Sequence, residues 1–204
     1  MKINYFYKGI FYTLLASLFW GIPQPLFFNE IKFIPAFEIA LHRALWSFIF
    51  LFTIILIFGE IDKFYLLFKS KKKIIFLSIT AFLITINWMG FIFAVSINRV
   101  QDASMGYYMT PMISIILGYI FLKEKMNSLK LISVIMMFFS LVFLLISLKT
   151  LPILAVLIGT TWGFYGLLRK QINVKSEIGL LYESGLISMI SIPYIVYLAY
   201  SGTG

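Results

Sequence analysis

Seven long apolar segments dominate the sequence and limit the folds open to it. Each is about 18 to 25 residues long, the length that a helix needs to cross a lipid bilayer. Of the 204 residues, 61% are hydrophobic and only 12% are charged, too little polar surface for a soluble domain. The pattern predicts an all-α, polytopic membrane protein with helices over residues 8–28, 35–58, 73–97, 105–122, 129–148, 151–168 and 178–198.

Lysine and arginine are distributed unevenly between the links that join these helices. Thirteen of the 17 basic residues lie at the amino terminus, or in or directly beside the links after the second, fourth and sixth helices. Three lie in the other links, at Lys32, Arg99 and Lys149, and Arg43 lies within a helix. Because basic residues resist translocation, we expect a cytoplasmic amino terminus. The net charge of +9 is thus a topology signal and does not indicate a nucleic-acid partner.

Two short fragments suggest an internal repeat. "SLFWG" at 17–21 resembles "GTTWG" at 159–163, and each precedes a helix that contains Glu-Ile, at Glu38 and Glu177. The offset between Trp20 and Trp162 is 162 minus 20, or 142 residues, close to the length of five helices. A repeated unit of five helices must enter the membrane from the opposite side the second time. We therefore expect inverted repeats over 1–150 and 151–204, the second being incomplete.

The link between the fifth and sixth predicted helices, around Lys149 and Pro152, is very short. These two helices are expected to form a tight antiparallel pair. In the first predicted helix, Gly21, Pro23 and Pro25 predict a kink or break that frees backbone carbonyls to line a cavity.

The stretch "AFEIALHRALW" at 36–46 places three ionisable residues in the second predicted helix. Such groups are costly in a bilayer and usually face a protein interior or a wet cavity. Glu38 and His42 form an i, i+4 pair, and Arg43 shares their broad face. Arg43 is interpreted as a solute ligand or as half of a structural ion pair, and His42 as a proton or solute ligand or as a packing residue. Glu38 is interpreted as a residue of the solute or proton pathway, or as one whose carboxylate extends to the outer lipid headgroups.

Other polar and aromatic residues are expected at the same depth. Counting residues along each helix places Asn87 and Trp88 beside Tyr107 and Tyr108, in the outer half of the bilayer, with Trp20 near mid-depth. The alternative for Trp88 and the tyrosines is an interfacial aromatic belt, and for Asn87 an interhelical hydrogen bond.

The seventh predicted helix contributes one acidic residue to the expected pathway. Glu183 lies near its cytoplasmic end and is interpreted as a proton-coupling group or as an interfacial residue.

Five segments resemble, in order and spacing, the RarD-type transporters of the EamA branch of the drug/metabolite transporter superfamily. They are "FWGIPQPLFF", "PAFEIALHRALWSF", "NWMGFIFAV", "DASMGYYMTPMISIILGYIFLKEK" and "WGFYGLLRK". The resemblance covers nearly the whole chain. It implies ten helices in two inverted repeats, a bacterial inner-membrane location, and export or exchange of small metabolites or drugs. The present sequence has about seven helices.

The leading function is therefore a secondary transporter that works by alternating access, with a small-molecule substrate and the lipid bilayer as partners. A homodimer is an open option. No Walker motif is present, so no built-in ATPase is expected. An intramembrane enzyme is disfavoured, because the chain has one His, no Cys, no HExxH and no GxSxG, and no cofactor or metal is expected. The third reading is a non-transporting partial protein or assembly partner.

Overall fold

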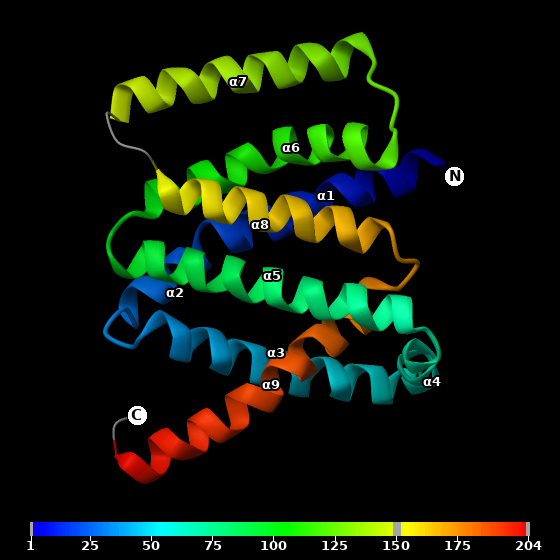
Figure 1. The fold of residues 1–204 in the computed structure, drawn as a ribbon, viewed down its shortest axis with the longest axis vertical. Coiled ribbons are helices and arrows are strands. Elements are labelled where there is room, and N and C mark those ends of the chain that lie inside the picture. Colours follow the sequence, from blue (N-terminus) through cyan, green and yellow to red (C-terminus); the bar gives the residue numbers. More distant parts are fainter. Residues whose placement is uncertain (1, 149–151, 203–204) are drawn as a thin grey trace.

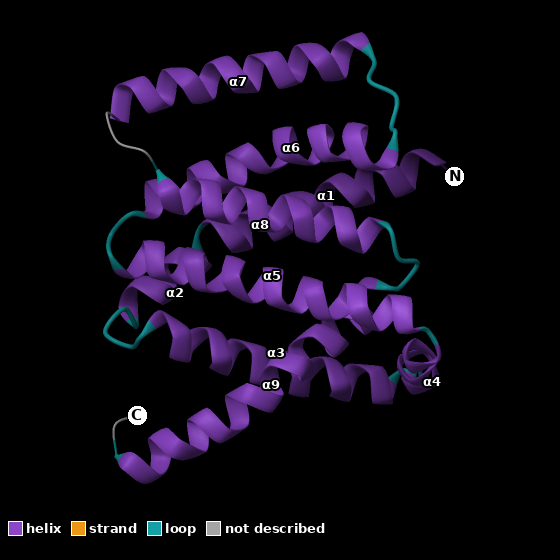
Figure 2. Cartoon of the chain, viewed as in Figure 1, coloured by secondary structure: helices purple, strands orange, loops and turns teal. Residues whose placement is uncertain are grey.

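The computed structural model describes residues 2–148 and 152–202, and every regular element in these two ranges is a helix (Figures 1 and 2). The long helices run back and forth along one direction, so that consecutive helices are antiparallel. The elements are α1 (Lys2–Gly21), α2 (Pro23–Glu30), α3 (Ala36–Ile57), α4 (Ile61–Tyr65), the short 3₁₀ helix η1 (Leu66–Lys69), α5 (Lys71–Ser96), α6 (Val100–Leu122), α7 (Ser128–Leu148), α8 (Ile153–Lys170) and α9 (Ser176–Ser201).

The predicted all-α fold is confirmed, with three differences in detail. α6 begins at Val100 rather than near residue 105, and α7 contacts α6 rather than forming the expected tight pair with α8. The two short helices α4 and η1 were not predicted, since nine residues are too few to carry a clear periodic pattern. Lys149, residue 151 and the proposed repeat boundary at 150/151 lie outside the described residues.

Five segments of the described chain are long and apolar enough to cross a membrane, as a multi-pass protein requires. The apolar part of α7, Ser128–Leu144, is shorter, and α8 is only 18 residues long and ends on Arg169 and Lys170. The five segments are Phe6–Glu30, Ala36–Ile57, Lys71–Ser96, Val100–Leu122 and Ser176–Ser201.

The break in the first segment falls at Ile22, between α1 and α2. Pro23 and Pro25 have no N–H to donate, so the carbonyls four residues earlier, on Phe19 and Gly21, lose their helical partners. The backbone of Ile22 departs from ideal helix geometry at φ −117° and ψ −68°. The predicted break is thus present at the predicted place.

α5 and α8 form the centre of the bundle, and α6 covers α8 from one side while α3 and α9 cover α5 from the other (Figure 1). The pairs α6/α8 and α3/α9 make the most extensive helix contacts, and α9 crosses α3 at a steep angle.

Two glycines allow α6 and α8 to touch. A Cβ added to Gly106 would lie 2.8 Å from Ile158 Cβ, and one added to Gly159 would lie 2.8 Å from the Gly106 carbonyl oxygen. Small residues serve this role between membrane helices.

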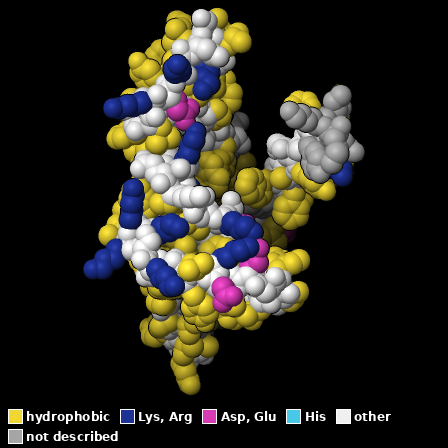
Figure 3. Space-filling view, turned by 90° about the vertical axis from the view of Figure 1, so that its right-hand side faces the viewer, with side chains coloured by type: hydrophobic (Ala, Val, Ile, Leu, Met, Phe, Trp, Pro, Cys, Tyr) yellow, Lys and Arg dark blue, Asp and Glu magenta, His cyan; other side chains and the backbone are white. Residues whose placement is uncertain are grey.

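The two ends of the bundle differ in charge. The links 58–70, 123–127 and 171–175 lie at one end, which we call the lysine-rich end, and the links 31–35 and 97–99 lie at the other, which we call the distal end. Figure 3 faces the lysine-rich end and shows its many basic side chains. They include Lys63, Lys69, Lys71, Lys72, Lys73, Lys123, Lys125, Lys130, Lys170 and Lys175.

Acidic side chains tie the links of the lysine-rich end to one another. Lys175 Nζ lies 2.8 Å from Glu60 Oε1, and Lys170 pairs with Glu124. Hydrogen bonds from Lys175 and then Lys63 lower the pKa of the Glu60 carboxyl, and a hydrogen bond from Lys170 lowers the pKa of Glu124. The α3–α4 turn is thereby joined to the α8–α9 link.

Candidate functional site

A cavity of about 410 Å³ lies in the distal half of the bundle, between the α1/α2 break and helices α3, α5, α6 and α8. We call it the central cavity. Its volume suits a small solute. The lining residues are Ser17, Trp20, Gly21, Gln24, Pro25, Arg43, Trp88, Phe91, Val100, Ser104, Tyr107 and Trp162.

Arg43 is the cation of the central cavity. It lies in the second turn of α3 and sets its guanidinium carbon 4.4 Å from the centre of the Trp88 ring, a cation–π contact. Among the described residues no carboxylate forms an ion pair with it. The alternative interpretation of Arg43, half of a structural ion pair, thus finds no partner in the described chain, and the guanidinium lies against an aromatic face at the edge of the cavity.

Aromatic rings form much of the remaining wall of the central cavity. Trp162 on α8 contacts Trp20 at a centroid distance of 6.4 Å and Tyr107 at 6.2 Å, in both cases edge to face. Edge-to-face pairs are a favourable geometry for aromatic rings. The wall is consequently built from residues of three helices that meet at Trp162.

Asn87 positions Tyr107 and does not face the cavity. Its side chain is fully buried, and its amide donates to the Ile158 carbonyl at 2.8 Å and to Thr161 Oγ1 at 3.1 Å. The Tyr107 hydroxyl donates to Asn87 Oδ1 at 3.2 Å. Asn87 thus makes interhelical hydrogen bonds, the alternative role given for it above, and joins α5, α6 and α8.

Glu38 and His42 border a second space, which we call the side cavity. It measures about 670 Å³ and lies between α2 and α3, with Arg43 and Trp46 also in its wall. Both side chains are half-buried, and within the described chain no hydrogen bond or ion pair joins them. Arg43 borders both the central and the side cavity. Helix α3, which carries it, therefore lies between the two.

The last two predicted pathway residues lie elsewhere. Tyr108 is 44% exposed and borders neither cavity, because one helical step turns it about 100° away from Tyr107. Glu183 is fully buried in α9, in the lysine-rich half of the bundle, and belongs to a separate polar network with Thr80, Tyr165 and Arg169. The predicted set is therefore divided among three places.

Several residues of these sites were not predicted. Gln24 and Ser104 are ordinary polar residues in apolar segments, and only their position beside the helix break and at the start of α6 brings them to the cavity. Trp162 was identified in the sequence only through its match with Trp20. Arg169 was counted as a link residue, but it lies in α8 and folds back against α9.

The central cavity can hold a small molecule that combines an anionic group with an apolar or aromatic body. Arg43 offers donors for the anion, and the rings offer flat apolar contact. Across the described ranges, no group of three or more His, Cys, Asp or Glu side chains is placed to hold a metal ion.

Comparison with known proteins agrees with this description. The EamA-like transporter family matches residues 7–146. Protein RarD of Escherichia coli is 34% identical over 196 residues, which cover 96% of this chain and 66% of the relative. An uncharacterized transporter of Bacillus subtilis, YojE, is 33% identical over 193 residues, 93% of this chain and 64% of the relative.

A further uncharacterized transporter, from Vibrio cholerae, is 33% identical over 192 residues, 94% of this chain and 63% of the relative. The chain thus spans less than two thirds of the length of these curated relatives. No solved structure matches it. The family match covers well over half of the chain and agrees with the RarD-type resemblance of the sequence, so this multi-pass membrane protein belongs to the EamA-like transporter family.

Proposed function

We propose that the central cavity is the solute site of a secondary transporter that exports or exchanges small metabolites or drugs across a bacterial inner membrane. The observation that carries this proposal is Arg43, a cation in the wall of a cavity with no carboxylate partner among the described residues. An arginine that serves only to join helices would be expected to have an acidic partner. A solute with a carboxylate or other anionic group supplies the missing charge.

The broken helix supports the same proposal. Solute sites of secondary transporters are typically built beside discontinuous helices, whose free backbone groups face the solute. Here Gly21 and Pro25 of the α1/α2 break line the cavity beside Arg43. The polar side chains of Ser17, Gln24 and Ser104 add hydrogen-bonding groups around an otherwise aromatic wall.

We place the lysine-rich end, and with it the amino terminus, in the cytoplasm. Basic residues concentrate in cytoplasmic links, and the three links of the lysine-rich end carry most of them. The central cavity then lies toward the outer surface of the membrane. In this orientation the chain presents its solute site to the outside.

Alternating access follows from the proposed inverted repeats, 1–150 and 151–204. Under this proposal α1 and α2 correspond to α8, and α3 corresponds to α9. The contact between Trp20 and Trp162 and the crossing of α3 and α9 are what a two-fold axis between the two units would produce. Rocking of one unit against the other would open the cavity to each side in turn.

A proton is the proposed coupling ion, with Glu38, His42 and Glu183 as candidate carriers. His42 and Glu38 border the side cavity and are half-buried, whereas Glu183 is fully enclosed by its partners. A carrier must exchange its proton with water, which favours His42 and Glu38 over Glu183. A homodimer of the chain is compatible with this proposed transport.

Counterflow in liposomes tests the proposed function. Radiolabelled benzoate, benzamide and benzylamine have similar size and differ in charge, so they probe the arginine and the aromatic wall separately. We expect saturable counterflow of at least benzoate, lost in Arg43→Gln and retained in Lys32→Gln, which removes an exposed cation at the distal end. Absence of counterflow for all three solutes, with a chain that is folded and inserted, would contradict transport by this chain.

A further inference from the structure

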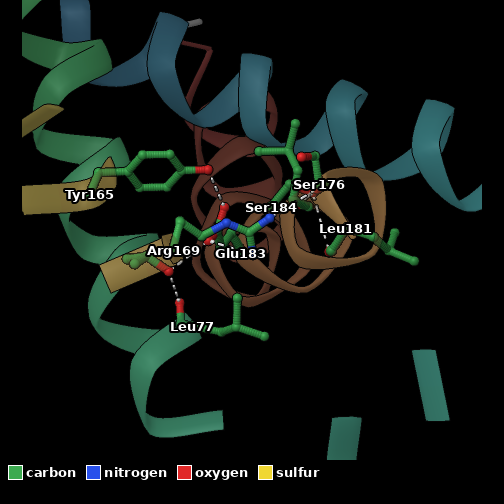
Figure 4. A network of polar contacts seen from close by, with 9 residues as sticks. Leu77, Tyr165, Arg169, Ser176, Leu181, Glu183 and Ser184 are labelled. Atoms are coloured by element: carbon green, nitrogen blue, oxygen red, sulfur yellow. Dashed lines mark hydrogen bonds and ion pairs between the residues drawn. The ribbon is translucent and has the colours of Figure 1, made fainter. Parts of the chain in front are cut away.

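A polar network in the lysine-rich half of the bundle joins helices α5, α8 and α9 (Figure 4). At its centre is Glu183, whose side chain is fully buried. Thr80 Oγ1 donates a hydrogen bond to Glu183 Oε1 at 2.6 Å, and the Tyr165 hydroxyl donates to Oε2 at 3.1 Å. Arg169 Nη1 lies 3.7 Å from Oε1. Each oxygen of the carboxylate therefore has a partner on a neighbouring helix.

Arg169 reaches this network from the end of α8 by crossing the surface of α9. It passes over Gly179, where a Cβ would lie only 1.6 Å from Arg169 Nη1, so the glycine makes room for the guanidinium. The second nitrogen, Nη2, donates to the Ser176 carbonyl at 3.3 Å. Nη1 is buried and makes no hydrogen bond to any described residue, so its polar interaction there is the ion pair with Glu183. This contact joins the end of α8 to α9.

The network begins where the central cavity ends. The Tyr165 ring stacks on Trp162 with the centroids 5.3 Å apart, and Trp162 lines the cavity. The same two rings pack against a buried apolar cluster that contains Leu41, Ile84 and Trp88. Trp162 thus forms the boundary of the cavity toward the lysine-rich end, which we call its floor. Beyond it, the Tyr165 hydroxyl bonds to Glu183.

The level of each residue follows from its place in α8. This helix runs from the distal end to the lysine-rich end, and Arg169 comes seven residues after Trp162. At 1.5 Å per residue, Arg169 lies about 10 Å closer to the lysine-rich end than the floor of the cavity. A solute that leaves the cavity along α8 toward that end therefore passes the level at which the network lies.

We infer that Thr80, Tyr165, Arg169 and Glu183 form the gate that closes the central cavity toward the lysine-rich end. This inference rests on the proposed function, since a gate requires a pathway. Opening separates α9 from α5 and α8, which breaks the two hydrogen bonds to Glu183 and the ion pair with Arg169. Tyr165 and Arg169 act here as positioning residues, because neither needs to touch the solute.

The absence of cysteine from the chain allows a direct test. Ser104→Cys places a single thiol in the wall of the central cavity. A membrane-impermeant maleimide is added to one side of vesicles at a time, and Lys69→Cys and Lys32→Cys serve as references for the lysine-rich and distal sides. The rate of labelling of Ser104→Cys from each side then reports which end of the pathway is open, without any requirement for transport.

Ser104→Cys is expected to react readily from the distal side and slowly from the lysine-rich side. Tyr165→Phe keeps the ring and its stacking but loses the bond to Glu183, and Glu183→Gln removes the ion pair with Arg169. Each should raise the rate from the lysine-rich side by about tenfold or more. Glu177→Gln is the matched control, because Glu177 lies on the same helix and its one ion pair within the described chain is with Lys175, at 3.8 Å.

Unchanged labelling from the lysine-rich side in both network variants would overturn the gate, and so would an equal rise in Glu177→Gln. Size-exclusion profiles and melting temperatures in detergent identify any variant that fails to fold. If Glu183→Gln does so, Tyr165→Phe alone decides, since it removes a single oxygen atom. A thiol at Ser104→Cys that reacts from neither side in any variant would contradict the cavity, and with it the proposed function.

Discussion

The indole rings of Trp20 and Trp162 meet edge to face in the wall of the central cavity, with centroids 6.4 Å apart and ring planes at 86°. The two residues occupy matching places in the proposed repeats, each in the Trp-Gly pair that precedes a Glu-Ile helix. Residues related by a two-fold axis touch each other only when they lie beside that axis. The position of this pair therefore argues that the axis of the proposed inverted repeat passes through the cavity.

Tryptophan fluorescence tests whether the central cavity takes an aromatic solute. Three of the four tryptophans, Trp20, Trp88 and Trp162, line this cavity, while Trp46 borders the side cavity. Benzoate is expected to change the emission of the purified chain in a saturable way, because it stacks among these rings. Trp46→Phe should keep the change and Trp162→Phe should reduce it. Loss of the change in Trp46→Phe would place the solute in the side cavity instead.

Replacement of Arg43 should affect anions and cations differently. Arg43→Ala removes the positive charge from the cavity wall, so the affinity for benzoate is expected to fall by about tenfold or more, and that for benzylamine to stay the same or rise. Equilibrium binding to the detergent-purified chain measures both. An equal loss for the two solutes would mean that Arg43 acts by supporting α3 against Trp88 and not by its charge.

Most of the fold could be predicted from the sequence. Apolar segments of bilayer length predicted the helices, and Gly21, Pro23 and Pro25 predicted the break that the structure places at Ile22. These are local signals, because the length of a helix and the effect of proline depend on neighbouring residues alone. Depth counting also brought Trp20, Arg43, Trp88 and Tyr107 to one level, and all four line the central cavity.

The direction of each side chain could not be predicted in the same way. Depth says how far along the helix a residue lies but not which neighbour it faces, and so Asn87 and Tyr108 were placed at the cavity although one is buried between helices and the other turns away. The partners of Glu183 come from α5 and α8, 103 and 18 residues away in sequence for Thr80 and Tyr165. Only the packing of three helices brings them together.

The prediction for His42 concerns pH. If His42 carries the coupling proton, His42→Gln should flatten the pH dependence of benzoate uptake into proteoliposomes, because the glutamine side chain cannot take up the proton. Glu38→Gln separates the two candidates of the side cavity. Uptake that keeps its full pH dependence in His42→Gln would remove His42 as the carrier.

Two glycines of α8 offer a matched test of the α6/α8 contact. A Cβ on Gly159 would lie 2.8 Å from the Gly106 carbonyl oxygen, whereas one on Gly166 would meet nothing within 4 Å. Gly159→Ala should therefore push the helices apart and lower the stability by about 1–3 kcal/mol. Gly166→Ala should be neutral or stabilising by up to about 1 kcal/mol, since alanine favours the helix. Thermal unfolding in detergent measures both, and equal effects would contradict the close contact.

The last prediction concerns the ion pair between Glu60 and Lys175 at the lysine-rich end. Hydrogen bonds from Lys175 and then Lys63 hold the pKa of Glu60 below its usual value, so the folded state favours the carboxylate. Its contribution to stability is present above the pKa of the unfolded glutamate and is lost as the pH falls through the lower pKa of the folded state. Glu60→Gln should thus lower the melting temperature slightly at pH 7, and the difference should shrink as the pH falls through the lowered pKa of Glu60.

Replacement of Lys175, the basic partner of Glu60, tests the same ion pair. Its hydrogen bond to Glu60 raises its pKa, so its contribution is complete below the unfolded lysine pKa and is lost only as the pH rises through the higher folded value. Lys175→Gln should therefore match Glu60→Gln near pH 7, because each variant breaks the same link between the α3–α4 turn and the α8–α9 link. A melting temperature that drops in one variant but not in the other at pH 7 would show that the pair does not act as a unit.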